Sequence, residues 1–334
     1  MRVVVDGPSN LGLRAPAPGV VPGCYKLAGA VRDQGFLGRI GAVDGGYVTP
    51  PRYDVHGWKL GDGVFNAAGM AAYTVRLADR VAPFVARGDF VVLLGGECSN
   101  LLGPALGLKR LGRYGVVYLD GHSDFRTTGN SPYVGAAGGE ALALVTGRGQ
   151  DDLTDLEGLG PYTRDTDAVL LGIRDDDEYV ADVAKAGIPV HRASEIAQDP
   201  QAVAAATLAH LTQRTEPSVG EAETGRADAG GPDPGGADAG RPDARGADAG
   251  GADAGELDGF WVHLDVDILD AAVMPAVDSP DPGGIGHAEL RALLRPLLAD
   301  PKCAGLDVGI FDPDLDPDGR YAAELTDTLV AALT

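Results

Sequence analysis

Short apolar runs alternate with amphipathic stretches along most of the chain. The runs are apolar at odd and even positions alike, which is typical of strands buried on both faces of a parallel sheet. They predict strands at 2–6, 38–42, 89–95, 114–120, 168–173, 188–191, 260–266 and 304–311. The intervening stretches predict helices at 24–34, 66–87, 99–111, 137–147, 176–186, 194–213, 287–298 and 319–333. This order predicts an α/β fold, a three-layer sandwich around a doubly wound parallel sheet of about eight strands.

One segment breaks the pattern. Residues 226–255 consist of six pentapeptides with Asp at the centre of each and carry no large apolar side chain. Such a stretch cannot offset its ordering entropy, so we predict a disordered acidic insertion at about 216–257 within a single domain spanning 1–334. A tolerated surface insertion and an acidic tether for a partner are both compatible with this composition.

The net charge and the cysteine content mainly exclude certain partners and a disulfide-bonded fold. The formal net charge of −22 argues against nucleic acid and against an anionic membrane surface as partners. The sequence starts without a charged-then-apolar leader, and its apolar runs fall short of the roughly 18 residues of a membrane span. Three widely spaced cysteines, Cys24, Cys98 and Cys303, do not predict a disulfide framework. We therefore expect a cytoplasmic protein.

Polar side chains follow three of the predicted strands. They are Cys98 after the strand at 89–95, Asp120, His122 and Asp124 at the end of 114–120, and Asp265 and Asp267 at the end of 260–266. Residues two apart on an extended chain share one side, and ligands of doubly wound sheets bind beyond the carboxyl ends of the strands. We expect these six side chains to form one site.

Four carboxylates in such a site repel one another, and either protonation or bound cations relieves the repulsion. Together with an imidazole and a thiol they can hold two divalent metals. Carboxylate and imidazole ligands suit Mn²⁺, with Zn²⁺, Fe²⁺, Co²⁺ or Ni²⁺ as alternatives. Two such ions lower the pKa of a bridging water towards neutrality. Structural turns at both acidic motifs are the competing interpretation.

Three segments carry a family resemblance. GGEC at 95–98, LDGHSD at 119–124 and HLDVDILDAAVMPAVDSPDPGG at 263–284 resemble the signature segments of the ureohydrolase family of arginases, agmatinases and formiminoglutamases. The resemblance covers most of the chain outside the insertion. It implies an arginase-like fold, a di-manganese centre that hydrolyses guanidino or related C–N bonds of a small-molecule substrate, and a homo-oligomer, either a trimer or a hexamer.

The resemblance also implies a role for each candidate ligand: two bridging residues, Asp120 and Asp265, and a further pair for each metal, Cys98 with Asp124 and His122 with Asp267. Asp124 would in addition be catalytic, accepting a hydrogen bond from a metal-bridging hydroxide. That hydroxide would attack a planar, electron-poor carbon, and the tetrahedral intermediate would lose an amine.

The sequence departs from the family at three places. Cys98 stands where the family has His; a Cys-ligated metal, a weakened first site, a single tightly held ion and an inert thiol all stay open. Residues 129–144 lack the family's proton-shuttling His. Glu140 is the nearest candidate for the general acid, although a carboxylate in the first turn of a helix is the more frequent role for such a residue. Ile310 stands where guanidinium-binding members have Glu.

Four further residues are candidates near the site. Asp278 could supply the negative charge that Ile310 does not, or could equally cap its own loop. Arg126 and Asn130 are predicted to bind substrate, although Arg126 could equally pair with a surplus carboxylate. His263 precedes Asp265 by two residues, and for it we predict a hydrogen bond to the site rather than direct metal binding.

These observations predict a metal-dependent hydrolase of non-peptide C–N bonds in a linear amidine or guanidino compound, N-hydroxyguanidines included. Two alternatives keep the same fold. One is a single-metal amidase or deacetylase, and the other is a catalytically inactive metal-binding homologue.

Overall fold

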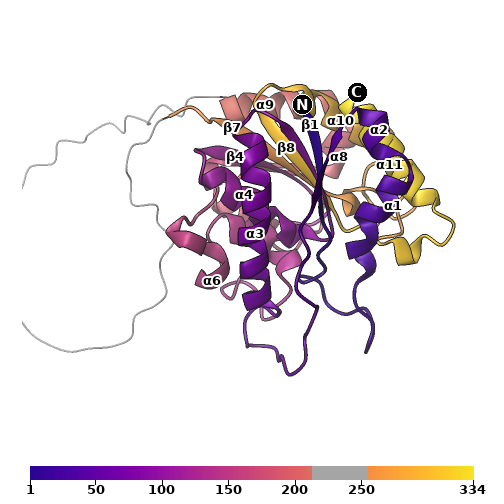
Figure 1. Ribbon diagram of the computed structural model, residues 1–334. Coiled ribbons are helices and arrows are strands. Elements are labelled where there is room, and N and C mark those ends of the chain that lie inside the picture. Colours follow the sequence, from indigo (N-terminus) through magenta and orange to yellow (C-terminus); the bar gives the residue numbers. More distant parts are fainter. Residues whose placement is uncertain (213–254) are drawn as a thin grey trace, which may run out of the picture. The chain divides into compact units, whose positions relative to one another are not determined.

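A parallel sheet of eight strands forms the middle layer of the computed structural model, which describes residues 1–212 and 255–334 (Figure 1). The order across the sheet is β2-β1-β3-β8-β7-β4-β5-β6, and every neighbouring pair is parallel. The strands are β1 (Arg2–Gly7), β2 (Val43–Tyr47), β3 (Phe90–Gly95), β4 (Tyr114–Leu119), β5 (Ala168–Ile173), β6 (Val190–Arg192), β7 (Gly259–Asp265) and β8 (Cys303–Gly309). The predicted α/β sandwich is thus confirmed.

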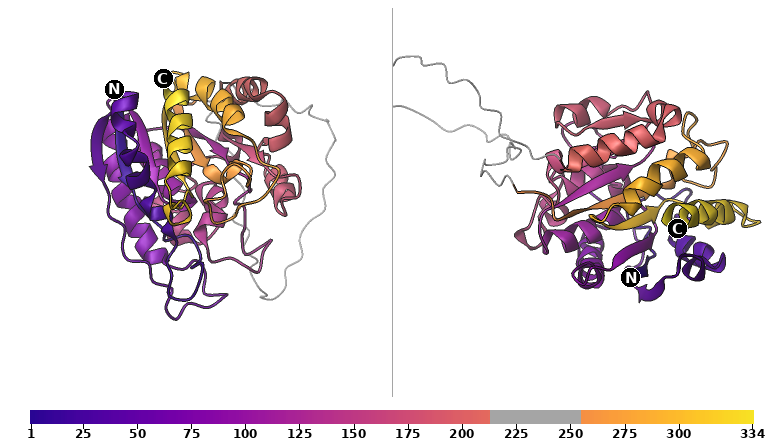
Figure 2. Two further views of the ribbon diagram at one scale, coloured as in Figure 1. Left: turned by 90° about the vertical axis from the view of Figure 1, so that its right-hand side faces the viewer. Right: turned by 90° about the horizontal axis from the view of Figure 1, so that it is seen from above.

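Helices cover both faces of the sheet (Figure 2). The α-helices are α1 (Leu27–Asp33), α2 (Phe36–Ile40), α3 (Ala67–Val85), α4 (Leu102–Lys109), α5 (Ala141–Val145), α6 (Asp151–Thr154), α7 (Val180–Lys185), α8 (Ala193–Gln198), α9 (Pro200–Thr212), α10 (His287–Ala299) and α11 (Arg320–Leu333). Helices α3 and α4 pack together in one layer. In the other layer α8, α9, α10 and α11 pack one against the next, and α1 and α2 pack against α11.

Short 3₁₀ helices mark several turns of the chain. They are η1 (Gly23–Lys26), η2 (Cys98–Leu101), η3 (Ala137–Glu140), η4 (Leu156–Gly158), η5 (Asp165–Asp167), η6 (Val266–Ile268) and η7 (Pro313–Leu315). Two of them matter most for function, because η2 directly follows the turn after β3 and η6 follows β7.

Two predicted elements were placed wrongly. The predicted strand at 38–42 overlaps α2, which buries Phe36 and Ile40 and ends at Gly41 in the left-handed conformation with φ 63°. The strand comes just afterwards, as the polar edge strand β2. The predicted helix at 194–213 is divided between α8 and α9, because Asp199 accepts a hydrogen bond from the amide of Ala202 and Pro200 begins a new helix.

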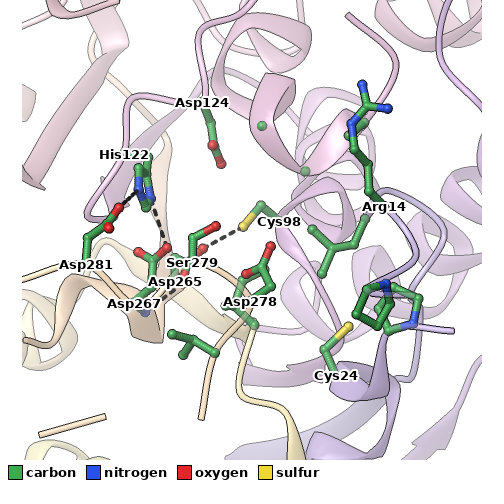
Figure 3. Close-up of a pocket in the computed structure, with 18 of the residues that line it drawn as sticks. Arg14, Cys24, Cys98, His122, Asp124, Asp265, Asp267, Asp278, Ser279 and Asp281 are labelled. Carbon is green, nitrogen blue, oxygen red and sulfur yellow. Dashed lines mark hydrogen bonds and ion pairs between the residues drawn. The ribbon is translucent and has the colours of Figure 1, made fainter. Parts of the chain in front are cut away.

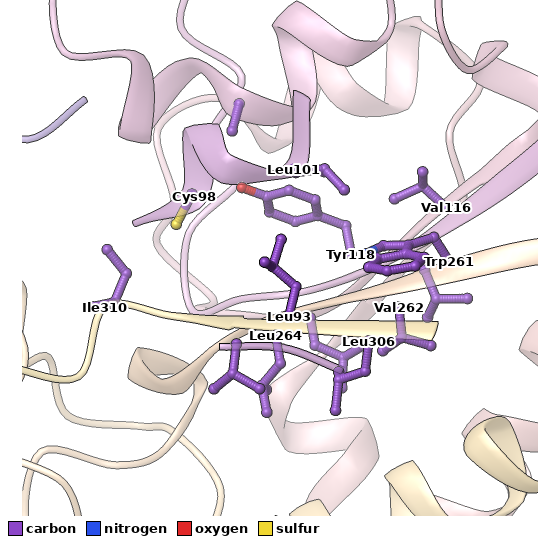
Figure 4. Close-up of a cluster of buried hydrophobic side chains, with 14 of the residues drawn as sticks. Leu93, Cys98, Leu101, Val116, Tyr118, Trp261, Val262, Leu264, Leu306 and Ile310 are labelled. Carbon is purple, nitrogen blue, oxygen red and sulfur yellow. The ribbon is translucent and has the colours of Figure 1, made fainter. Parts of the chain in front are cut away.

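The centre of the sheet is fully buried. Every residue of β5 and of β7 is buried, as expected for parallel strands covered on both sides. Figure 4 shows Trp261, Tyr118 and leucines from several strands in one cluster, with Cys98 and Ile310 at its edge. Burying each such leucine stabilises the fold by about 1.5–3 kcal/mol, which gives the neighbouring polar loops a rigid base.

Residues 1–212 and 257–334 form one compact unit. The predicted acidic insertion, about 216–257, falls almost entirely outside the described residues.

Candidate metal centre

Strands β3, β8, β7 and β4 are consecutive in the sheet, so the loops that follow them meet at one edge. These loops carry all six predicted ligands, which Figure 3 shows in part around a common cleft. The arrangement follows from parallel topology, because parallel strands bring all their carboxyl ends to the same side.

The loop after β3 is held tightly. Gly96 lies against the first loop of the chain, and a Cβ atom there would come within 1.5 Å of the Ser9 carbonyl oxygen. The fully buried Glu97 accepts hydrogen bonds from the amide of Gly12 at 3.1 Å and from the amide of Ser99 at 2.9 Å. These contacts fix the start of η2, and with it the side chain of Cys98.

The loop after β4 brings Asp120 and His122 together. Asp120 Oδ1 accepts the amide hydrogen of His122 at 2.6 Å, and the carboxyl group is fully buried. Asp124 adopts φ 45°, in the left-handed region, and its Oδ2 accepts a hydrogen bond from the Tyr118 hydroxyl. A non-glycine residue with positive φ stores strain, and such residues gather at functional sites.

The end of β7 forms a tight turn of two aspartates. Asp265 Oδ1 accepts the amide hydrogen of Asp267 at 2.8 Å, and Asp265 Oδ2 lies 3.0 Å from the sulfur of Cys98. Asp267 Oδ2 lies 2.9 Å from His122 Nδ1, and its Oδ1 accepts the amide hydrogen of Gly121. The three loops are therefore linked through their candidate ligands.

The candidate acids are buried close together, and this shifts their pKa values. Burial, and then the charge of Asp267, raises the pKa of Asp120 to about 7. Burial and neighbouring carboxylates also raise the pKa values of Asp124 and Asp265. Burial alone would raise the pKa of Asp267 too, but its hydrogen bond and ion pair with His122 bring it below the ordinary value. One acid thus forms an ion pair while the others favour their neutral form.

Among residues 1–212 and 255–334, two groups of side chains have the spacing of a metal site. The first contains Asp120, His122 and Asp267, and the second contains Cys98, Asp120 and His263; within each group one ligand atom per residue lies within 4.8 Å of the others. Asp120 belongs to both groups. Buried carboxylates, imidazoles and a thiol fit divalent transition metals, whose charge offsets the repulsion among the acids.

The centre opens into a cleft of about 1180 Å³. Its wall includes many acidic side chains: Asp176, Asp177, Glu178, Asp281, Asp312 and Asp314, besides Asp124, Asp265 and Asp267. Arg14 and Arg126 also line it. Arg14 lies over the ring of Trp58, and Arg126 Nε donates to the carbonyl of Gly139 at 3.1 Å.

Of the predicted catalytic and substrate-binding residues Arg126, Asn130, Glu140 and Asp278, the structure brings two to the cleft wall, Arg126 and Asp278. Burial, and then the charges of Asp267 and Asp124, raises the pKa of Asp278, although the residue stays exposed to the cleft. Asn130 is absent from the wall; its amide donates to the carbonyl of Phe125 and to Asp182. Glu140 is also absent from it, is buried, and accepts the amide hydrogen of Gly135 at 2.7 Å.

Ile310 lines the cleft at the position where guanidinium-binding members of the family have Glu. Its φ is 76°, which is an unusual conformation for a β-branched residue, and its amide donates to the carbonyl of Gly96 at 2.6 Å. This bond joins the end of β8 to the loop that carries Cys98. The cleft wall at this position is therefore apolar.

Several residues of the site were missed by the sequence analysis. Asp281 Oδ2 lies 3.1 Å from His122 Nε2, and the buried Arg174 donates to the carbonyl oxygens of Asp267 and Leu269. The sequence could have indicated Asp281, because it lies in the SPDPGG segment of the loop that follows Asp265 and Asp267. Arg174 directly follows the predicted strand at 168–173, a signal of the same kind that was not used, whereas Arg14 had none.

The comparisons with known proteins agree with this geometry. A family model described as the arginase family matches residues 31–219 and 248–334, and these ranges contain all six predicted ligands. The chain belongs to the arginase family. The predicted resemblance is therefore confirmed.

Arginase-family relatives match over nearly the whole chain. An arginase of Brevibacillus brevis is 27% identical over 327 residues, covering 96% of this chain and 93% of the relative. A formimidoylglutamase of Aeromonas salmonicida is 25% identical, covering 92% and 83%. The crystal structure of the arginase from Bacillus caldovelox matches with a TM-score of 0.78 at 22% identity, covering 99% and 97%, which supports the fold.

Among residues 1–212 and 255–334, no helix has the length and hydropathy needed to cross a membrane.

Proposed function

We propose that this protein is a metal-dependent hydrolase that cleaves a non-peptide C–N bond in a linear amidine or guanidino compound. The observation that carries the proposal is the convergence of Cys98, His122 and four aspartates at the carboxyl ends of β3, β4 and β7. Such a cluster of buried acids is expensive without cations, and it opens into a cleft large enough for a small molecule.

The six predicted ligands would hold the metal, with Asp120 and Asp265 at the centre of the cluster. Bound divalent cations, Mn²⁺ above all by family, would lower the pKa of water and provide hydroxide at neutral pH. Asp124 would accept a hydrogen bond from the attacking water, because it lines the cleft and the Tyr118 hydroxyl orients its carboxylate.

The cleft has groups for both ends of an elongated substrate. Asp278 stands near Asp267 and Asp124 and would pair with an amidinium cation, in place of the Glu that Ile310 replaces. Arg14 and Arg126 would bind an anionic group at the other end. This combination supports a substrate with a cationic C–N centre and a carboxylate.

The names of the relatives support the same substrate class. They are arginases and formimidoylglutamases, and the structural relatives include a proclavaminate amidino hydrolase from Streptomyces clavuligerus. The cytoplasmic location and the trimer or hexamer suggested by the sequence stay predictions. Glu140 and Asn130 also stay predictions, and we favour Asp278 over Glu140 as the acidic group that contacts substrate, because only Asp278 lines the cleft.

A second candidate function is a single-metal amidase or deacetylase. The group of Cys98, Asp120 and His263 favours it, since catalytic zinc sites commonly have three protein ligands and one open position.

Assays of the metal-loaded protein test the proposal. The protein is loaded with Mn²⁺ or Zn²⁺, and urea or ammonia release is measured from arginine, agmatine, N-hydroxyarginine and formiminoglutamate. We expect release above a metal-only blank, and a higher kcat/KM for arginine than for agmatine, which lacks the carboxylate. Arg126→Met should remove that preference.

Asp267→Asn is the control variant and should lose activity with every substrate. Acetylated amines form a second panel. Turnover of these alone would favour the amidase, and no turnover in either panel with metal bound would favour an inactive metal-binding homologue.

A further inference from the structure

His263 lies in β7, two residues before Asp265, and is fully buried. Its Nδ1 atom lies 2.6 Å from Asp307 Oδ2, whose other oxygen accepts the indole N–H of Trp261 at 2.6 Å. Within the described residues, its Nε2 atom has no hydrogen-bond partner. Buried polar atoms are rarely left unsatisfied, so this one needs an explanation.

The tautomer of His263 follows from its contact with Asp307. A carboxylate oxygen only accepts, so the bond requires the hydrogen on Nδ1, and in the neutral ring Nε2 then carries the lone pair. The ring cannot easily turn away, because it packs on the ring of Tyr118 with centroids 4.4 Å apart. A carboxylate that orients a histidine through one nitrogen while the other binds a cation is the usual arrangement at metal sites.

The His263 ring lies close to two other candidate ligands. Ligand atoms of His263, Cys98 and Asp120 lie within 4.8 Å of one another, and all three residues are buried. Asp120 Oδ2 also has no hydrogen-bond partner among the residues that the structure describes. Two of the three residues near one another thus carry a buried polar atom without a partner among the described residues, and the third carries a thiol.

We propose that Cys98, Asp120 and His263 form an inner metal site that selects a zinc-like cation over Mn²⁺, with Asp307 orienting His263. Asp120, His122 and Asp267 form an outer site of oxygen and nitrogen ligands, and Asp120 joins the two. The inference deepens the proposed function and rests on its assignment of this cluster as the metal centre.

The chemistry of the donors decides the selectivity. Thiolate is a soft ligand that favours zinc, and imidazole suits zinc equally, whereas manganese prefers carboxylate and water. The outer site has no thiol and is open to the cleft through His122. The two positions therefore differ in ligand softness, and we expect them to take different metals.

X-ray absorption on the wild-type, full-length protein tests the inner site directly. The protein is stripped with a chelator and given one equivalent of Zn²⁺ in the presence of excess Mn²⁺. We expect one bound zinc, with a zinc–sulfur distance of about 2.3 Å and zinc–nitrogen distances of about 2.0–2.1 Å. A zinc shell of oxygen and nitrogen alone, or displacement of zinc by manganese, would overturn the proposal.

Variants identify the ligands, and Co²⁺ gives an optical signal for them. One equivalent of Co²⁺ should produce a thiolate-to-cobalt charge-transfer band that Cys98→Ser abolishes and that Cys24→Ser, a buried thiol of the same cleft, leaves intact. His263→Asn keeps a donor for Asp307 but removes Nε2, and should weaken zinc binding at least as much as Asp307→Asn, for which we expect about 10–100-fold. Unchanged zinc affinity in His263→Asn would exclude His263 from the site.

These readouts need no substrate, so they separate the two proposals. A sulfur-containing zinc site without turnover of any amidine would support the inner site and contradict the hydrolase. Amidine turnover with manganese alone, and no sulfur ligand on zinc, would support the hydrolase and contradict the inner site.

Discussion

Arg174 Nη2 donates a hydrogen bond to the backbone carbonyl of Asp267 at 2.7 Å, and thereby holds the turn that presents this candidate ligand. The same group donates to the carbonyl oxygens of Leu269 and Asp281, each at 3.2 Å. The side chain is 5% exposed, so no water can take its place. The buried arginine fixes a loop, and it also lines the cleft.

We predict that Arg174→Lys lowers metal affinity about 10–100-fold and destabilises the fold by about 1–3 kcal/mol, because several buried carbonyl groups lose their donor. Isothermal titration with metal and chemical denaturation measure the two effects. Arg320→Lys, at an exposed position on α11, is the matched control and should change neither. Metal affinity equal to that of the wild type in Arg174→Lys would show that the turn at Asp267 does not depend on the Arg174 hydrogen bonds.

Cys98→His should raise the amount of Mn²⁺ bound per chain. Imidazole suits manganese better than thiolate does, and the change restores the residue that the family normally has at this position. Metal analysis after dialysis against Mn²⁺ measures the effect, with Cys303→His on β8 as a control for an added imidazole. Unchanged occupancy would remove Cys98 from the ligands.

Removing metal should destabilise the protein. A cation present at 100 times its Kd adds about 2.7 kcal/mol to the free energy of unfolding, which corresponds to roughly 5–10 °C in Tm. We expect a chelator to lower Tm by that amount and added Zn²⁺ or Mn²⁺ to restore it. In Asp267→Asn the restoration should shrink. A Tm that responds to neither chelator nor metal would contradict the metal centre.

Glu140 should make stability depend on pH. Burial raises its pKa to about 7, above the ordinary value of 4.5, so the folded state binds this proton more tightly than the unfolded state does. Its contribution is therefore favourable below pH 4.5 and is lost as the pH rises to about 7, by up to about 3 kcal/mol. Above pH 7 it no longer changes.

Glu140→Gln removes this titration and keeps an acceptor for the amide of Gly135. Denaturation curves in chelator between pH 4 and pH 8 should show a smaller loss of stability for the variant. The two proteins should differ least at pH 4. Parallel curves over the whole range would show that Glu140 does not titrate in this window.

Asp278→Asn should raise KM for a cationic guanidino substrate by about 10–100-fold, because a charge-assisted hydrogen bond contributes about 1.5–3 kcal/mol. Initial-rate kinetics measure this effect. Asp314→Asn is the control, since Asp314 lines the same cleft but already forms an ion pair with Lys26. A change in kcat with constant KM would place Asp278 outside substrate binding.

The sequence contained enough information to predict the sheet and the convergence of the ligands. Buried strands with polar groups at their carboxyl ends specify both, because parallel topology determines where those ends meet. The edge strand β2 was misplaced because its residues, VDGGY, are largely polar and the apolar residues just before it belong to a helix. The local hydrophobic pattern alone does not distinguish a short apolar helix from a buried strand, or a polar edge strand from a loop.

The environment of His263 could not be predicted from the sequence. Alternation placed it on the side of Asp265, but only the register of β7 with β8 puts His263 beside Asp307. Likewise, Asn130 lies near the second motif in sequence, yet its loop turns the amide towards Asp182 and away from the cleft. Pairing between distant segments decides both positions.

The contact between Gly96 and Ser9 joins two parts of the protein that have different tasks. The first loop of the chain contributes Arg14 to the cleft and also braces Glu97, the residue directly before Cys98. If the proposed roles hold, this loop would couple the binding of a substrate to the binding of the metal. Rebuilding the first loop to change substrate specificity would therefore also alter how much metal the site binds. A variant with a new preferred substrate would have to keep the contacts of this loop with Glu97.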